Sequence, residues 1–447
     1  MEAKPRRTLL SNLVELGLCL VLLEGLLRRL APELNMVLMG VKFIYFPTLY
    51  ALFFPDLKRG IRRCPLGFGL ISWLTWGLLI SLIKAPSSPM VHLLGIVINL
   101  LFVPLIWIGA SAYPTVLEVR VLMYRLALLS AGIGAFGIYQ TFLPASHPLN
   151  MAMDFTTNAL SAGSGWYRIT STLPHCNLFG SFVSIGMISA LASIRLGKGW
   201  RSNAVGISGL VLIYGGGIFS GSRMATVCAL LVMGAWFVRD IGLLLKILFA
   251  GMAGLCVVAS ICAVDPSLME SIAPDASMRA FDTEELTGRT TDMYFGSNFG
   301  NGADASEDGL GVGWGVYTMG VASYAERLGL ESAHDGRMVE SGFSIIVAHL
   351  GVFGIFFFGL MHVGLLLTSI RRGGWRGALV AALAVWSFLA HLPLSMFEIP
   401  TLCIPFWLLL GVGLNDENRF PAAQAKPQLR LMPKRTLPSV GTSWKVA

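Results

Sequence analysis

Long apolar stretches alternate with short polar ones along most of the chain, and this alternation is the strongest pattern in the sequence. Each apolar stretch is near the roughly 20 residues that a helix needs to cross the hydrocarbon core of a membrane. We therefore predict an all-α integral membrane protein, a polytopic bundle of about 12 transmembrane helices. The predicted spans are 8–27, 33–54, 65–83, 90–110, 120–143, 175–194, 203–220, 222–238, 241–263, 341–369, 376–393 and 397–414.

The composition and charge agree with a chain whose solvent is mostly lipid. Of its residues, 55% are hydrophobic and 13% are charged. The net charge of +8 is explained by basic cytoplasmic loops and anionic lipid, and it does not indicate nucleic-acid binding. The basic groups that place the amino terminus inside are Lys58, Arg59, Arg62, Arg63, Arg195, Lys198, Arg201, Arg371, Arg372 and Arg376. Arg28 and Arg29 oppose this rule on a short outer loop, and Lys42 is expected to snorkel from a cytoplasmic helix end.

Most of the remaining polar residues are predicted to lie at the outer face, in residues 144–174 and 264–340. The second segment holds fourteen of the twenty-five acidic residues, against four arginines and no lysine, and it is predicted to form a small extracytoplasmic subdomain. Helices 1–9 then occupy residues 1–263, helices 10–12 occupy 341–414, and 415–447 is a disordered cytoplasmic tail. The seven cysteines show neither a disulfide framework nor metal-binding spacing, so we expect no metal and no cofactor.

Three arginines at the outer face carry the candidate chemistry: Arg168, Arg223 and Arg289. An arginine costs roughly 2.5–3.5 kcal/mol at the centre of a membrane helix on insertion scales. One that is kept at membrane depth therefore usually faces a cavity, a partner or an anion.

The first arginine opens the motif Arg168-Ile-Thr-Ser-Thr-Leu-Pro-His-Cys-Asn177, where an outer loop enters a helix. A guanidinium matches phosphate oxygens bidentately, and Ser171, Thr172 and Asn177 can add neutral hydrogen bonds on the same surface. The alternative is a cation that anchors a helix end beside a capping hydroxyl.

The second arginine lies in Phe219-Ser-Gly-Ser-Arg-Met-Ala225, a polar break between two apolar helices. Ser222 can cap the next helix, while Arg223 falls in its first turn, where the helix dipole disfavours a cation. This conflict favours an anion site made by Arg223 and the free amides of the helix start. The alternative is an interfacial hairpin from which Arg223 snorkels.

The third arginine, Arg289, precedes the glycine run 309–315 and a polar stretch that holds His334, Arg337 and Glu340. The run has neither the strand nor the Lys-Ser/Thr ending of a nucleotide-binding loop. Its glycines permit close approach of the main chain either to a ligand or to a neighbouring helix. Near the last span, Glu398 is a candidate for binding sugar hydroxyls, with a structural hydrogen bond as its alternative. We expect His92, His349 and His391, on apolar helices, to be packing residues.

These motifs, in this order over roughly residues 160–370, resemble the membrane polysaccharide polymerases and O-antigen ligases of the Wzy/WaaL-like superfamily. The shared features are an arginine before a small-polar run that ends in asparagine (Arg168 to Asn177), a Ser-Arg pair at a helix start (Ser222-Arg223), and an arginine early in a large outer loop (Arg289). A Gly-rich turn and a helix with Gly351-Val-Phe-Gly354 close the pattern. Cys176 stands where the family has a proline.

The resemblance implies a GT-C-like, metal-independent glycosyltransferase of the bacterial inner membrane, with its active site facing the periplasm. It implies a donor glycan on undecaprenyl diphosphate, a glycan acceptor, contact with membrane lipid, and a chain-length regulator or flippase as a possible partner. The diphosphate is assigned to Arg168, Arg223 and Arg289. Substrate binding is assigned to Ser171, Thr172, Asn177, Ser222, Arg337 and Glu398.

Glu340 is the first candidate for the base that activates the acceptor hydroxyl, and His334 is the second. Ligases of the family usually have a His-Asn or His-Ser pair where this chain has Glu340-Ser341, and this difference favours a polymerase. The ligase, with lipid A-core as its acceptor, stays an alternative. A flippase of lipid-linked saccharide is a more distant one, since the sequence shows neither an evident repeat nor a matched pair of broken helices.

Overall fold

The computed structural model describes residues 3–144, 146–150, 169–220, 222–238, 309–317, 341–391 and 394–415. Within these ranges the protein is all-helical and contains no strand. The predicted span 241–263, the subdomain 264–340 outside 309–317, and the tail after Asn415 lie outside the described residues.

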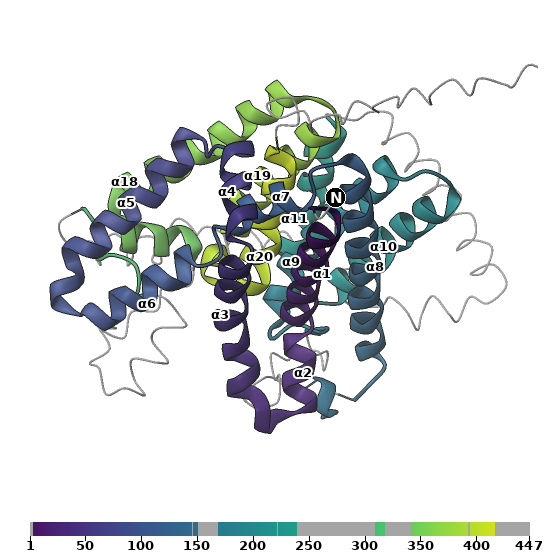
Figure 1. Cartoon of the computed structure of the whole chain (residues 1–447). Helices are drawn as coiled ribbons and strands as arrows, with labels where there is room; N and C mark the ends of the chain where they lie inside the picture. The colour runs from purple at the N-terminus through teal and green to yellow at the C-terminus, as the bar shows by residue number, and fades with distance from the viewer. Residues whose placement is uncertain are drawn as a thin grey trace, which may run out of the picture.

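Two groups of helices flank the amino-terminal helices α1, α2 and α3 (Figure 1). One group of helices, α5, α6 and the later α18, lies at one side of the view, and α8 and α10 lie at the other. The amino-terminal elements are α1 (Ala3–Leu22), α2 (Glu24–Leu30), η1 (Pro32–Leu34), α3 (Asn35–Leu52), α4 (Phe54–Arg63), α5 (Phe68–Lys84), η2 (Ala85–Ser87), α6 (Pro89–Leu100), α7 (Leu105–Ala112), α8 (Val116–Thr141) and η3 (Pro148–Asn150).

The later helices complete the bundle and supply its centre. They are α9 (Cys176–Leu196), α10 (Trp200–Phe219), α11 (Arg223–Phe237), α18 (Gly342–Arg372), α19 (Gly374–Ala390), η4 (Met396–Glu398) and α20 (Pro400–Leu414). Nearly every residue of α9 and α20 is buried. A helix that is apolar around its whole circumference belongs in a core, and these two helices are surrounded by α7, α8, α10, α11 and α19.

The helices support the membrane class that the sequence predicts. Six of those described are long and apolar enough to cross a membrane, or seven if the bent pair Thr8–Leu22 and Glu24–Leu30 counts as one span. Four shorter apolar helices, Phe68–Lys84, Val227–Phe237, Gly374–Ala390 and Pro400–Leu414, also coincide with predicted spans. The total of 12 crossings stays a prediction.

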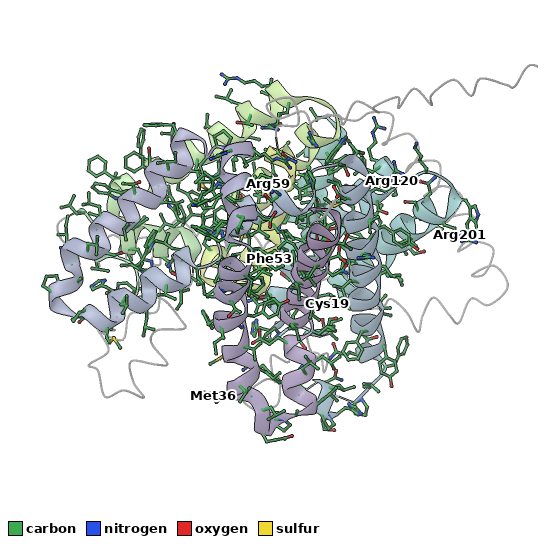
Figure 2. The ribbon with its side chains drawn as sticks, in the orientation of Figure 1. Cys19, Met36, Phe53, Arg59, Arg120 and Arg201 are labelled. Carbon is green, nitrogen blue, oxygen red and sulfur yellow. The ribbon has the colours of Figure 1, made fainter. Side chains whose placement is uncertain are left out.

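Arg59 and Arg201, which the sequence assigns to the cytoplasmic side, lie toward the same end of the molecule (Figure 2). Figure 2 shows Arg59, Arg120 and Arg201 in the upper half of the view and Met36 at the lower end. Arg59 belongs to α4, a short helix that packs on α7 and pairs Arg59 with Asp56 at 2.7 Å. The lower end, where α2 meets α3, is therefore the end that the sequence assigns to the outer face.

Two of the interruptions in the described apolar helices bear on the site, and the sequence did not indicate either of them. The axis bends by 57° between α1 and α2, around Leu23. Inside α18, Gly351 leaves the helical conformation with φ +64° and ψ −162°. Broken apolar helices expose backbone polar groups that need new partners, so each break marks a place where another segment comes close.

The glycine run fills the break in α18 and uses its freedom against a helix. The backbone N–H groups of Val312 and Gly313 donate to the carbonyls of Ala348 and His349, both at 2.8 Å. Gly311 lies against the carbonyl of His349, in a left-handed conformation with φ +90°. Of the two uses expected for this run, close approach to a neighbouring helix is the one observed.

Trp314 anchors the same run between α5 and α6. Its N–H donates to Ser81 Oγ at 2.8 Å, and its carbonyl lies 3.0 Å from His92 Nδ1. His391 likewise contacts the carbonyl of Ser387 at 2.6 Å. The expectation that His92 and His391 serve packing is confirmed.

Replacing Gly311 with alanine is predicted to destabilise the protein by about 2–4 kcal/mol, because a Cβ adds a backbone collision to the cost of a left-handed conformation. The matched control is Gly309→Ala, since Gly309 also has positive φ (+71°) but open space around its Cβ position. It should cost only about 1–2 kcal/mol. Thermal unfolding midpoints in one detergent measure both, and equal shifts would contradict the packing described here.

Candidate functional site

A buried arginine holds residues 169–174, the segment that leads into α9. Arg29, near the end of α2, donates from Nη1 to the carbonyls of Leu149 at 2.9 Å and Ser171 at 2.8 Å. Its Nη2 donates to the carbonyl of Leu173. A guanidinium that serves three carbonyls is engaged in holding backbone, so Arg29 is a structural cation.

Ser171 and Thr172 are buried, and their hydroxyls bond to the protein itself. Ser171 Oγ donates to the carbonyl of Ile133 at 2.5 Å, while its N–H donates to Gln140 Oε1 at 2.7 Å. Thr172 Oγ1 donates to the carbonyl of Leu22 at 2.8 Å. Both hydroxyls therefore position backbone in this structure. The substrate contact predicted for Ser171 and Thr172 stays a prediction.

Next to this segment lies a charged cluster on α2 and α3. Lys42 Nζ in α3 is 2.6 Å from Glu24 Oε2, and Arg28 Nη1 in α2 is 3.3 Å from Glu24 Oε1. Arg28 Nε also donates to Asn35 Oδ1, at the start of α3. Lys42 and Glu24 are both buried. Two cations thus share one carboxylate, which leaves the trio with a net positive charge.

The trio lines a cavity of about 200 Å³ at the end of the molecule assigned to the outer face. Its lining combines charged and apolar side chains. The lining residues are Glu24, Arg28, Met39, Lys42, Pro174, Leu178, Ile345, Leu394, Ser395, Glu398, Ile399, Pro400 and Thr401.

Three helices begin beside this cavity. Leu178 lies in the first turn of α9, Ile345 in the first turn of α18, and Thr401 in the first turn of α20. A helix start carries the positive end of the helix dipole, so the three starts add to the positive field of Arg28 and Lys42. This end of the molecule favours an anion.

Glu398 lines the same cavity from η4, and the residue before it is part of an aromatic layer. Glu398 Oε1 lies 3.5 Å from His349 Nδ1, and both side chains are buried. His349, expected to be a packing residue, therefore also faces a carboxylate. Phe397 stacks on Trp407, with ring centroids 5.0 Å apart and planes at 16°.

The other two described site residues lie at helix starts. Asn177 is half-buried in the first turn of α9, and its N–H donates to His175 Nδ1 at 3.2 Å. Ser222 holds the N-cap position of α11, as predicted, but its side chain makes no capping hydrogen bond. Arg223 is the first residue of that helix. Neither Asn177 nor Ser222 is among the residues that line the cavity.

The prediction for Lys42 is wrong. It does not snorkel at a cytoplasmic end, because the chain reverses between α2 and α3 and brings Lys42 against Glu24 in the apolar interior. A signal for this pair existed: one acid and one base stand in consecutive predicted spans, where unpaired charges would be costly. Arg28 and Arg29, which oppose the positive-inside rule, mark the same hairpin.

Five predicted site residues lie outside the described residues: Arg168, Arg289, His334, Arg337 and Glu340. Arg168 directly precedes the clamped segment 169–174 in the chain, and Glu340 directly precedes Ser341, the buried N-cap of α18. No protein-family model matches this chain, and no curated protein matches it.

Replacing Arg29 with methionine is predicted to cost about 3 kcal/mol, because buried carbonyls lose a charged donor. It should also loosen the entry to α9, so that Cys176, now buried, reacts faster with a maleimide. The experiment uses a background in which Cys176 is the one cysteine left. Arg201→Met, which removes an exposed cation at the opposite end, is the control, and equal labelling rates in the two variants would contradict the clamp.

Proposed function

We propose that this protein is a membrane glycosyltransferase that transfers a glycan from undecaprenyl diphosphate to the hydroxyl of a lipid-linked glycan acceptor at the outer face. The observation that supports it most directly is the cavity where Arg28 and Lys42 meet the starts of three helices. It combines positive charge for a diphosphate with an apolar wall for a lipid chain.

The residues fit the chemistry of this transfer. A diphosphate leaving group carries its charge away with it, so its departure needs charge neutralisation more than protonation, and preplaced arginines supply that. In the proposal, Arg168, Arg223 and Arg289 bind the diphosphate as it leaves. Glu340, or else His334, takes the proton of the acceptor hydroxyl, and Arg337 and Glu398 hold sugar groups.

The membrane setting completes the proposal. Twelve crossings with the amino terminus inside put the cavity, residues 144–174 and residues 264–340 on one side, the periplasmic face of a bacterial inner membrane. Positive charge on α4 faces the other side. The lipid carrier then enters laterally between helices, and its diphosphate reaches the cavity without leaving the membrane surface.

A lipid-linked saccharide carrier is the second candidate, because one observation favours it. Carriers place ionisable residues beside interrupted helices, and the buried Glu24–Lys42 pair lies directly after the break between α1 and α2. A flux assay in proteoliposomes separates the two functions. Transport without any change in glycan length would support the carrier, whereas a longer glycan made in detergent cannot come from transport alone.

The test is incubation of the purified protein with a lipid-diphosphate-linked oligosaccharide and analysis of product length on a gel. Lengthening is expected, with a rate lowered on the order of 10²–10³-fold in Arg168→Ala and Arg289→Ala. The matched control is Arg279→Ala, an arginine of the same outer segment that lies outside the motifs. It should keep the rate of the natural protein.

Two results would count against the polymerase. Full activity in both arginine variants would remove the proposed diphosphate site. Failure to lengthen the host's own repeat unit, together with transfer to added lipid A-core, would make the protein a ligase.

A further inference from the structure

We propose that the cavity between α2, α3 and the starts of α9, α18 and α20 binds the phosphate part of a lipid-linked substrate. The Glu24 carboxylate occupies the phosphate position until the substrate displaces it. Arg28 and Lys42 are the binding cations. The lipid part of this ligand rests on the function proposed above, whereas the phosphate chemistry follows from the cavity itself.

Glu24 occupies the position that an anion would take. Its two carboxylate oxygens meet one cation each, Lys42 Nζ at 2.6 Å and Arg28 Nη1 at 3.3 Å. A phosphate group offers the same pattern of oxygens with more charge, so it can replace the carboxylate against both cations. A carboxylate in this place compensates the buried Lys42 and the partly buried Arg28.

Arg28 and its neighbour Arg29 divide two tasks. Arg29 donates hydrogen bonds to three backbone carbonyls, so its Nη1 and Nη2 cannot also bind a ligand. Arg28 is fixed at Nε by Asn35 and turns its Nη1 to Glu24 at the cavity wall. The bond to Asn35 sets the direction of the guanidinium before any ligand arrives, which lowers the entropy lost on binding.

The size and lining of the cavity suit a phosphate headgroup together with the first carbons of a lipid chain. Its volume of about 200 Å³ equals that of roughly six or seven waters, at ~30 Å³ each. Met39 and Leu178 line it together with the charges, and the apolar side chains give the first carbons of a lipid chain a surface to contact.

The second carboxylate of the cavity acts against anion binding and limits its strength. Glu398 lines the wall, and its partner His349 lies 3.5 Å away. With Glu24 and Glu398 both ionised, the two carboxylates balance the two cations. Displacing Glu24 from Arg28 and Lys42 is therefore the step that makes the site attractive to phosphate, and Glu24 should weaken binding in the natural protein.

The experiment measures binding to the purified full chain in detergent, with undecaprenyl diphosphate in one arm and inorganic pyrophosphate in the other. The substitutions are Lys42→Gln, Arg28→Gln and Glu24→Gln. The control is Arg201→Gln, which makes the same charge change at an exposed position on the opposite end (Figure 2). A thermal unfolding midpoint for each variant separates lost binding from lost folding.

Loss of either cation should weaken binding of the lipid diphosphate by roughly 10- to 100-fold, the worth of one hydrogen bond to a charged group. Glu24→Gln should tighten it by ~10-fold, because a negative charge leaves the site. Arg201→Gln should change nothing. Similar trends with inorganic pyrophosphate would show that the phosphate alone is recognised, and trends confined to the lipid would show that the lipid chain is needed.

Binding that is equal in all four variants, or weaker in Glu24→Gln while its unfolding midpoint is unchanged, would overturn the inference. No binding of either ligand by the natural protein would overturn it too. These outcomes differ from failure of the proposed function: glycan lengthening with unchanged binding in the cation variants rejects the inference alone, and the expected binding pattern without lengthening or transfer rejects the glycosyltransferase alone.

Discussion

Arg29 is the residue on which the candidate site depends. A buried cation has to be satisfied by protein groups, and this one uses the carbonyls of residues 149, 171 and 173. Gly25 lets the backbone of Leu173 come into direct contact with α2. Because 169–174 is fixed in this way, α9 begins beside the first helix pair, and the cavity wall contributed by Pro174 and Leu178 follows from that start.

A second constraint acts from the opposite side of the cavity. Unpaired backbone groups at the break in α18 need partners, and the glycine run 309–315 supplies them because its residues reach conformations closed to other side chains. The break lies two residues after His349, which turns its ring toward Glu398. The backbone hydrogen bonds at the break near Gly351 thus help to position His349 beside Glu398 in the cavity lining. The hydrogen bonds of Arg29 position the part of the lining that Pro174 and Leu178 contribute.

The length of the apolar stretches was enough to find the apolar helices in the described ranges, because a membrane helix satisfies its own backbone hydrogen bonds whatever its neighbours are. The basic helix α4 was not found in this way, because its residues fall in a predicted loop. Side-chain partners were harder to predict, since they depend on which helices meet. The sequence predicted that Lys42 snorkels, whereas in the structure Lys42 pairs with Glu24. Nothing in the sequence indicated that the hydroxyls of Ser171 and Thr172 donate to the carbonyls of Ile133 and Leu22. The exception was Arg28 and Arg29, whose conflict with the positive-inside rule marked the hairpin in advance.

The aromatic layer beside the cavity bears on whether a substrate reacts at one face or passes through. Phe397, next to Glu398 in the chain, packs on Trp73 with ring centroids 4.8 Å apart and on Trp407 at 5.0 Å. All three rings are buried. A path through this layer would have to separate the three rings and open the packed interior around α20, at the cost of dispersion and apolar contact. Chemistry at one face needs no such opening, so the packing favours transfer over transport.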